Sequence, residues 1–134
     1  MTFYEQKLSR LKQSLYKNQG QIDAVIAIKN YIDNNYGSDV NLDQLSKTQF
    51  ISKYHLLRVY KKYYGLTPKQ YLIDKRIAQA KKHLQNGKNV TETCVAVGFE
   101  SLGSFSALFK NKTGKSPYSF RKEQLSRSNS VIND

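Results

Sequence analysis

The chain is short and strongly basic. Its 134 residues fit one small domain or two lobes that share a core, and they leave no room for a second, sizeable ligand-binding domain. Lys and Arg number 22 against 10 Asp and Glu, which gives a formal net charge of +12 and favours a polyanion as partner. The single cysteine excludes an intramolecular disulfide and a cysteine-rich zinc site, and it indicates a reducing compartment such as the cytoplasm. No apolar run approaches the roughly 20 residues that span a bilayer, so no membrane partner is expected.

Positive charge is concentrated in two segments without acidic residues. The first covers residues 44–73 and the second covers residues 101–122. The acidic residues all lie outside these segments, for example Asp33, Asp39 and Glu92. The distribution predicts two separate basic surfaces rather than one evenly charged protein.

Apolar residues recur at helical spacing through the N-terminal half, and the alternation typical of strands is absent. The fold class is therefore predicted to be all-α, with about seven helices. A helix with Val25, Ile28 and Ile32 on one face ends near residues 34–37, and a short helix follows at about 42–48. The next helix begins after Ser52, a good N-cap, and stops at Gly65.

The C-terminal half repeats this order of helices. A longer linker helix is predicted over residues 67–86, followed by a short helix at about 90–97, a helix from Ser101 to Gly114 and a last helix at 116–125. The polar tail, residues 126–134, is predicted to be disordered. Residues 1–20 form either an extra amphipathic helix or an arm that frays, and the sequence leaves both open. The apolar side of such a helix would carry Tyr4, Leu8, Leu11 and Leu15.

The chain contains an internal repeat. When the sequence is compared with itself at an offset of 49 residues, the distance from Ser52 to Ser101, the helix-capping, core and helix-stop residues of the two halves coincide. The aligned pairs are Ser52 with Ser101, Leu56 with Phe105, Tyr60 with Phe109, Gly65 with Gly114, Thr67 with Ser116, and Pro68 with Pro117. For the short helix before the turn, the offset is one residue smaller, since Leu42 aligns with Val90. The second turn is therefore expected to be one residue longer than the first. The repeated unit is a short helix, a tight turn and a second helix.

This repeated unit predicts a helix-turn-helix rather than a simple packing corner. A recognition helix must anchor one face in the core and leave the opposite face free and positively biased. The helix after Ser52 carries Leu56, Val59, Tyr60 and Tyr63 on one, inward face, so it turns its basic residues outward. The linker helix rises about 28 Å, close to the roughly 34 Å between successive major-groove segments. One chain can therefore bridge two segments without a two-fold dimer, and it is expected to bind DNA as a monomer.

The two units resemble the DNA-binding domain of the AraC/XylS family of transcriptional regulators. The first unit reads LDQLSKTQFISKYHLLRVYKKYYGLTPKQYL, and the second reads VTETCVAVGFESLGSFSALFKNKTGKSPYSFRK, after a linker motif DKRIAQAKKHL. The resemblance covers about residues 22–122 and implies two helix-turn-helix lobes tied by a linker helix. The predicted domain is residues 21–125, with helix-turn-helix units at 42–66 and 90–114. The resemblance also implies double-stranded DNA as partner, with RNA polymerase as a second partner.

Carried over by position, the resemblance assigns a base-reading face to each recognition helix. The first face is Lys53, Tyr54, Leu57 and Arg58, where Arg58 suits a bidentate contact to guanine. The second face is Leu102, Gly103, Ser106 and Ala107, none of which can make a bidentate contact. Sequence specificity is therefore predicted to be lopsided toward the first half-site. The alternative for each residue is a solvated helix face.

The predicted phosphate contacts are basic residues and hydroxyls at helix N-termini. They are Ser52, Lys61, Lys62, Thr67, Lys69, Ser101, Lys110, Lys112, Lys115, Ser116 and Arg121. Plain helix capping explains each hydroxyl equally well. Phe99, Phe105, Phe109 and Phe120 are predicted to be core residues rather than a base-stacking platform.

No catalytic chemistry is predicted. Cys94 is expected to be a packed thiol, His55 and His83 belong to no ligand-spaced cluster, and neither a metal nor a cofactor is expected. Three alternatives to a sequence-specific regulator stay open. They are an architectural DNA-binding protein, a DNA-binding fragment of a longer regulator, and an adaptor with Tyr54, Leu57 and Tyr64 as its partner surface. The sequence does not indicate the operator, the effector, or activation as against repression.

Overall fold

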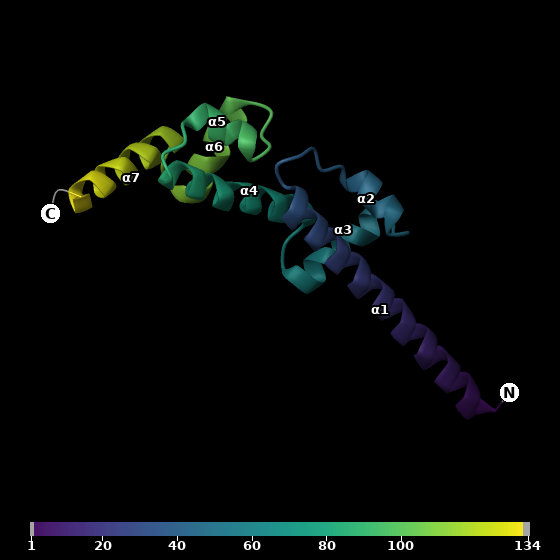
Figure 1. The fold of residues 1–134 in the computed structure, drawn as a ribbon. Helices are drawn as coiled ribbons and strands as arrows, with labels where there is room; N and C mark the ends of the chain where they lie inside the picture. Colours follow the sequence, from purple (N-terminus) through teal and green to yellow (C-terminus); the bar gives the residue numbers. More distant parts are fainter. Residues whose placement is uncertain (1, 133–134) are drawn as a thin grey trace. The chain divides into compact units, whose positions relative to one another are not determined.

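The computed structural model describes residues 2–132, which form seven α-helices and no strand (Figure 1). The helices are α1 Phe3–Asn35, α2 Leu42–Thr48, α3 Lys53–Tyr64, α4 Pro68–Gln85, α5 Val90–Ala96, α6 Leu102–Thr113 and α7 Pro117–Ile132. The predicted all-α class and helix number are confirmed. Within the described part of the chain, no helix is both long and apolar enough to cross a membrane.

The chain divides into two compact units. Unit 1 comprises residues 1–32 and 41–69, and unit 2 comprises residues 33–40 and 70–134. In unit 1, α2 packs on α3, and the buried apolar side chains come from the C-terminal half of α1 and from α3. They are Ala24, Val25, Ile28, Ile32, Leu56, Val59 and Tyr60.

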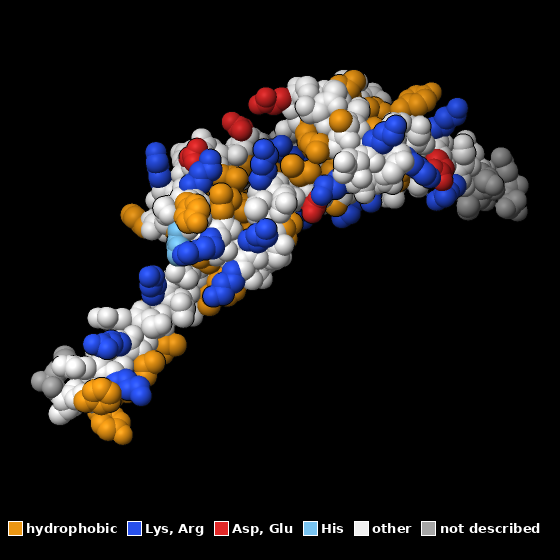
Figure 2. Space-filling model, turned by 180° about the vertical axis from the view of Figure 1, so that it is seen from behind, with side chains coloured by type: hydrophobic (Ala, Val, Ile, Leu, Met, Phe, Trp, Pro, Cys, Tyr) orange, Lys and Arg blue, Asp and Glu red, His pale blue; other side chains and the backbone are white. Residues whose placement is uncertain are grey.

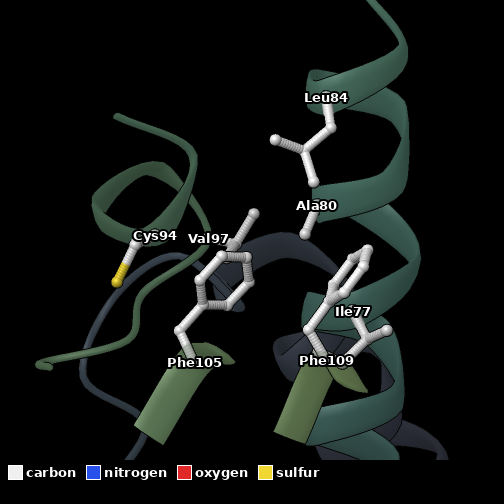
Figure 3. Close-up of a cluster of buried hydrophobic side chains, with 7 residues drawn as sticks. All are labelled: Ile77, Ala80, Leu84, Cys94, Val97, Phe105 and Phe109. Carbon is white, nitrogen blue, oxygen red and sulfur yellow. The ribbon is translucent and has the colours of Figure 1, made fainter. Parts of the chain in front are cut away.

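The core of unit 2 forms between α4 and α6. Figure 3 shows Ile77, Ala80 and Leu84 along one side of α4, with the rings of Phe105 and Phe109 directed toward them from α6. Both rings are fully buried, and their centroids lie 5.7 Å apart. Phe99 packs against Phe105 and Phe120 against Phe109, at ring-centroid distances of 5.2 and 5.4 Å. The phenylalanines are thus core residues, as the sequence predicted.

The sequence repeat is a repeat of backbone hydrogen bonds. Ser52 and Ser101 cap α3 and α6 by accepting from the backbone N–H three residues on. Gly65 and Gly114 end the same helices in the left-handed conformation, at φ 80° and 83°. The short helices match in the same way, because Asn41 and Asn89 cap α2 and α5. These two asparagine caps were not identified from the sequence.

The two ends of the chain differ from the sequence expectations. α1 is one helix from Phe3 to Asn35, which resolves the open question about residues 1–20 in favour of a helix. α7 continues to Ile132 and so differs from the predicted disordered tail at 126–134, of which 133 and 134 lie outside the described residues. Extension is favoured because each added residue gains one backbone hydrogen bond, and Arg127 pairs with Glu123 at 2.7 Å one turn earlier.

A close backbone approach joins the α1–α2 loop to the turn between α5 and α6 in unit 2. A Cβ at Gly98, where φ is 94°, would lie 2.7 Å from the Tyr36 carbonyl oxygen, and one at Gly37 would lie 2.9 Å from the Ala96 carbonyl oxygen. Arg76 secures the same loop, since it donates to the carbonyls of Tyr36 and Ser38 at 2.8 and 3.0 Å. Burial lowers the pKa of the Arg76 guanidinium, against the raising effect of nearby acids.

Replacing Gly98 by Ala should destabilise the protein far more than replacing Gly114. Both residues have positive φ, which costs a Cβ-bearing residue about 1 kcal/mol. Only Gly98 adds a clash with backbone, so we expect about 3 kcal/mol for Gly98→Ala and about 1 kcal/mol for Gly114→Ala. Urea unfolding followed by circular dichroism measures both. Equal losses would show that the loop moves away from the turn without cost.

Candidate nucleic-acid interface

The first recognition helix, α3, buries one face and exposes the opposite face, as a helix that enters a DNA groove must. Its buried face consists of Leu56, Val59 and Tyr60, of which Leu56 and Tyr60 are fully inaccessible. The predicted base-reading residues Lys53, Tyr54 and Arg58 are exposed, with Tyr54 at 77%. Leu57 is half-buried, so only part of its side chain is available for an apolar contact. The helix therefore presents a basic and aromatic face opposite its anchor.

Arg58 is held by a short relay that begins on α1. The side-chain amide of Gln21 contacts Nε2 of His55 at 2.9 Å, and Arg58 Nη2 donates to Nδ1 of the same ring at 3.0 Å. Because a guanidinium group only donates, Nδ1 accepts from Arg58, and Nε2 then carries the ring hydrogen, which it donates to the Gln21 side chain when the amide is turned with its oxygen toward the ring. The relay reduces the number of orientations that Arg58 adopts, which favours contact with a planar base edge. Sequence reasoning missed it, since Gln21 and His55 belong to different helices.

The C-terminal end of α3 corrects two predictions. Tyr63 was placed on the inward face but is 43% exposed, while Tyr64, predicted to lie on an exposed partner surface, is half-buried. The Tyr64 ring packs 4.7 Å from that of Tyr60, centroid to centroid. A helical turn of 3.6 residues makes both the third and the fourth residue after Tyr60 possible neighbours, and the sequence alone does not choose between them. The adaptor surface proposed from Tyr54, Leu57 and Tyr64 therefore loses part of its area.

The turns of the two helix-turn-helix units place different residues at the same left-handed position, and the second turn is one residue longer. Phe50 has φ 54° and is 98% exposed, and it occupies the position that Gly98 fills in the second unit. The surrounding hydrogen bonds are equivalent, with Ile51 N–H bonded to Ser46 O and Phe99 N–H bonded to Cys94 O. A positive φ is strained for an aromatic residue. Phe50 was not identified from the sequence, which gives no signal for positive φ without glycine.

The second recognition helix, α6, presents small and apolar side chains. Leu102, Gly103 and Ala107 are exposed, and Ser106 is half-buried. A Cβ at Gly103 would meet no atom within 4 Å, so the surface beside it is open. This face can approach DNA closely, but its side chains offer no bidentate donor or acceptor pair.

The predicted phosphate-binding cations fall into three groups. Lys61, Lys62, Lys69 and Lys110 are exposed, and none of them takes part in the ion pairs found between described residues. Lys112 pairs with Asp74 at 3.1 Å, and Lys115 pairs with Glu123, lowering the pKa of that carboxyl mainly through their hydrogen bond. Arg121 is different, because it is half-buried and donates to the carbonyls of Lys88 and Gly87, both at 3.1 Å. It therefore closes the turn after α4.

The hydroxyls at the helix starts are occupied by capping bonds. Ser52, Ser101 and Ser116 each accept from the backbone N–H three residues on, at 3.1 Å. Thr67 stands directly before α4, which starts at Pro68. The remaining free N–H groups at these termini can still attract an anion. The positions thus fit both capping and phosphate contact.

Other chemistry is sparse in the described part of the chain. Cys94 is buried in the unit 2 core, as predicted, and burial raises the pKa of its thiol. Across residues 2–132, no three His, Cys, Asp or Glu side chains gather in a way that could hold a metal ion. Figure 2 shows many Lys and Arg and few Asp and Glu side chains on the visible face. The exposed chemistry is that of a polyanion-binding surface.

Comparison with known proteins decides the family. A family model described as a helix-turn-helix domain matches residues 45–123, more than half of the chain. The chain belongs to the AraC/XylS family of helix-turn-helix proteins. This AraC/XylS chain is 32% identical over 117 residues to the Msm operon regulatory protein of Streptococcus mutans, covering 87% of the chain and 41% of that relative.

Two further relatives extend the comparison. The bifunctional transcriptional activator/DNA repair enzyme AdaA of Bacillus subtilis is 36% identical over 107 residues, covering 79% of the chain and 50% of AdaA. The crystal structure of the DNA-binding domain of AdpA in complex with a target DNA has the same fold, with a TM-score of 0.72 and 22% identity. That match covers 77% of this chain and 94% of the AdpA domain. The chain spans half or less of the two curated relatives named above.

Replacing Arg121 by Ala should reduce stability. The variant loses two charge-assisted bonds to backbone carbonyls, and we expect a loss of about 1 to 2 kcal/mol in the free energy of unfolding. Lys122→Ala is the matched control, because Lys122 is exposed and its removal should change stability by less than about 0.5 kcal/mol. Urea unfolding measures both variants. If Arg121→Ala kept full stability and lowered only the salt dependence of DNA binding, the phosphate role predicted from the sequence would hold instead.

Proposed function

We propose that this AraC/XylS-type chain binds double-stranded DNA sequence-specifically and regulates transcription, with α3 and α6 as its two recognition helices. The observation that carries the proposal is the outward row Lys53, Tyr54 and Arg58 on a helix whose opposite face is fully buried. Such a helix can enter a major groove without losing its anchor. The same hydrogen-bonded unit occurs a second time in the chain, around α6.

We propose that one chain occupies one site, with the two recognition helices in successive major-groove segments. The 18 residues of α4 lie between the two helix-turn-helix units in the sequence. Base discrimination comes mainly from α3, while α6 contributes contacts with DNA phosphates and apolar contacts with thymine methyl groups. The operator should therefore have one sharply defined half and one loosely defined half.

The remaining parts of the proposal follow from the family. The protein acts in the cytoplasm on the bacterial nucleoid and contacts RNA polymerase as a second partner. It acts as a regulator and not as an enzyme, so no catalytic residue is assigned. The repair activity in the name of AdaA is not carried over to this chain, which spans 50% of AdaA.

A second candidate function is architectural DNA binding without sequence preference. Two observations favour it, the net charge of +12 and the absence of a hydrogen-bonding pair on the exposed face of α6. In that function, affinity would come from phosphates alone and would fall steeply with salt for every sequence. Sequence-specific binding is the better supported candidate, because Arg58 is oriented by its own hydrogen-bond relay rather than left free.

Arg58→Ala should remove sequence discrimination, and Lys61→Ala should not. A site selected from random duplexes at about 0.15 M salt should bind at least about 10³-fold tighter than scrambled DNA. Loss of a bidentate contact at Arg58 should reduce this ratio by roughly 10- to 100-fold. Lys61→Ala removes a phosphate contact, so it should weaken both duplexes alike and lower the salt slope by about one. Fluorescence anisotropy across a salt series measures both effects.

Two results would contradict the proposal. An unchanged ratio in Arg58→Ala would mean that Arg58 does not read a base. A wild-type ratio near one, with the same steep salt slope, would favour the architectural function. Folding of each variant is checked by thermal unfolding, because neither side chain is buried and both variants should keep the wild-type melting temperature.

A further inference from the structure

The N-terminal half of α1 carries an apolar stripe that no described part of the chain covers. Its members Tyr4, Leu8, Leu11 and Leu15 are 52% to 77% exposed. Figure 2 shows apolar side chains along this end of the molecule, beside Lys and Arg side chains. Isolated exposed leucines are ordinary, but a continuous row of large apolar residues on one helix face indicates a contact surface.

The spacing of the stripe is that of a coiled coil. Successive members are four, three and four residues apart, which keeps a seam straight along a pair of supercoiled helices. The row ends at Asn18, which occupies the next position of the same pattern. After it, the apolar face turns inward, and Val25 and Ile28 are buried in unit 1. The four-member stripe thus belongs to a different contact from the core of the domain.

The helix that carries the stripe is already formed. α1 is continuous from Phe3 to Asn35, and its start is fixed by reciprocal bonds between Thr2 and Glu5 at 3.1 and 3.2 Å. The N-terminal half continues a helix whose C-terminal half is anchored in the core of unit 1, so it forms without a separate, unfavourable nucleation step. A partner helix therefore meets a largely preorganised surface.

We propose that the stripe binds the stripe of a second copy of this chain, as an antiparallel helix pair. Tyr4 then packs against Leu15 of the other copy, and Leu8 packs against Leu11, which gives four apolar layers related by a two-fold axis. The proposal is independent of the proposed DNA sites. It leaves the exposed face of α3 free, because the stripe ends before the part of α1 that packs in unit 1.

Charge decides between the antiparallel and parallel arrangements. In a parallel pair, Lys7 of one copy would lie beside Lys12 of the other, twice in each dimer. In the antiparallel pair, Lys12 lies beside Glu5 of the other copy, also twice, and Lys7 lies beside the neutral Ser14. Glu5 is exposed, and its carboxylate can accept a lysine in addition to its bond with Thr2. Opposite charges therefore flank the antiparallel seam.

The seam is short, so the dimer should be weak. Four layers bury less surface than the roughly 1,200 Å² of a stable standard interface. Self-association is expected at high protein concentration in solution and at lower concentration where two chains occupy neighbouring DNA sites. Pairing would thus link two chains that each read one site, without altering how one chain reads its own.

The first test asks whether the stripe pairs. Sedimentation equilibrium of the wild-type chain over a wide concentration range should fit a monomer–dimer equilibrium. The double variant Leu8→Glu/Leu11→Glu should weaken it by at least about 100-fold, since it places charges in the middle layers. Gln6→Glu/Gln13→Glu is the matched control, with the same charge change on the opposite side of α1. A chain that stays monomeric throughout, or a control as disruptive as the double variant, would overturn the proposal.

The second test asks which way the helices run. Lys12→Glu should weaken the dimer roughly tenfold, because it turns two attractive pairs into two repulsive ones. Lys7→Glu makes the same charge change beside Ser14 and should leave the dissociation constant within about twofold. In a parallel dimer both variants would instead tighten association, and that result would overturn the antiparallel arrangement. All of these positions are exposed, and unchanged thermal unfolding of the variants verifies that the units remain folded.

Discussion

Everything at the candidate interface depends on how each recognition helix is anchored. In unit 2, the buried rings of Phe105 and Phe109 fix the rotation of α6 about its axis by packing on α4. In unit 1, Leu56 and Tyr60 do the same for α3. A helix rotated by one residue would turn about 100° and bury the residues proposed to reach DNA. The anchors therefore decide which side chains are available for reading bases, although none of them can contact a base.

The two units share their anchors and caps but differ in their turns and in the hydrogen bonds that orient the outward side chains of the recognition helix. In unit 1 the turn holds Phe50 at a positive φ, and Arg58 is bonded to His55, which is itself bonded to Gln21 of α1. In unit 2 the corresponding turn uses Gly98 without strain, and the outward face of α6 has few polar atoms to orient. The hydrogen bonds that orient an outward side chain of a recognition helix lie in the first unit, and they support the proposal that this unit reads bases.

Sequence reasoning located the helices well because residues next to each helix end determine where it begins and stops. Ser52, Ser101, Gly65 and Gly114 each act within a few residues of their own position, and all four cap the helices that the pattern predicted. It gives no signal where a side chain bonds to backbone far along the chain. Arg76 with the 36–38 loop and Arg121 with the 87–88 turn each join segments more than 30 residues apart. A basic residue has the same local pattern whether it faces a carbonyl or a phosphate.

Because several interface lysines already pair with carboxylates, the salt dependence of DNA binding should not report the full number of lysine–phosphate contacts. Lys53 pairs with Asp43, Lys112 with Asp74 and Lys115 with Glu123, and all these groups are at least partly exposed. Exposed pairs are weak, so a phosphate can replace the carboxylate at little cost. The released carboxylate then interacts with cations from solution, which offsets part of the counterion release that the phosphate contact produces. The salt slope should therefore be smaller than the number of lysines at the interface, with the deficit largest in unit 2.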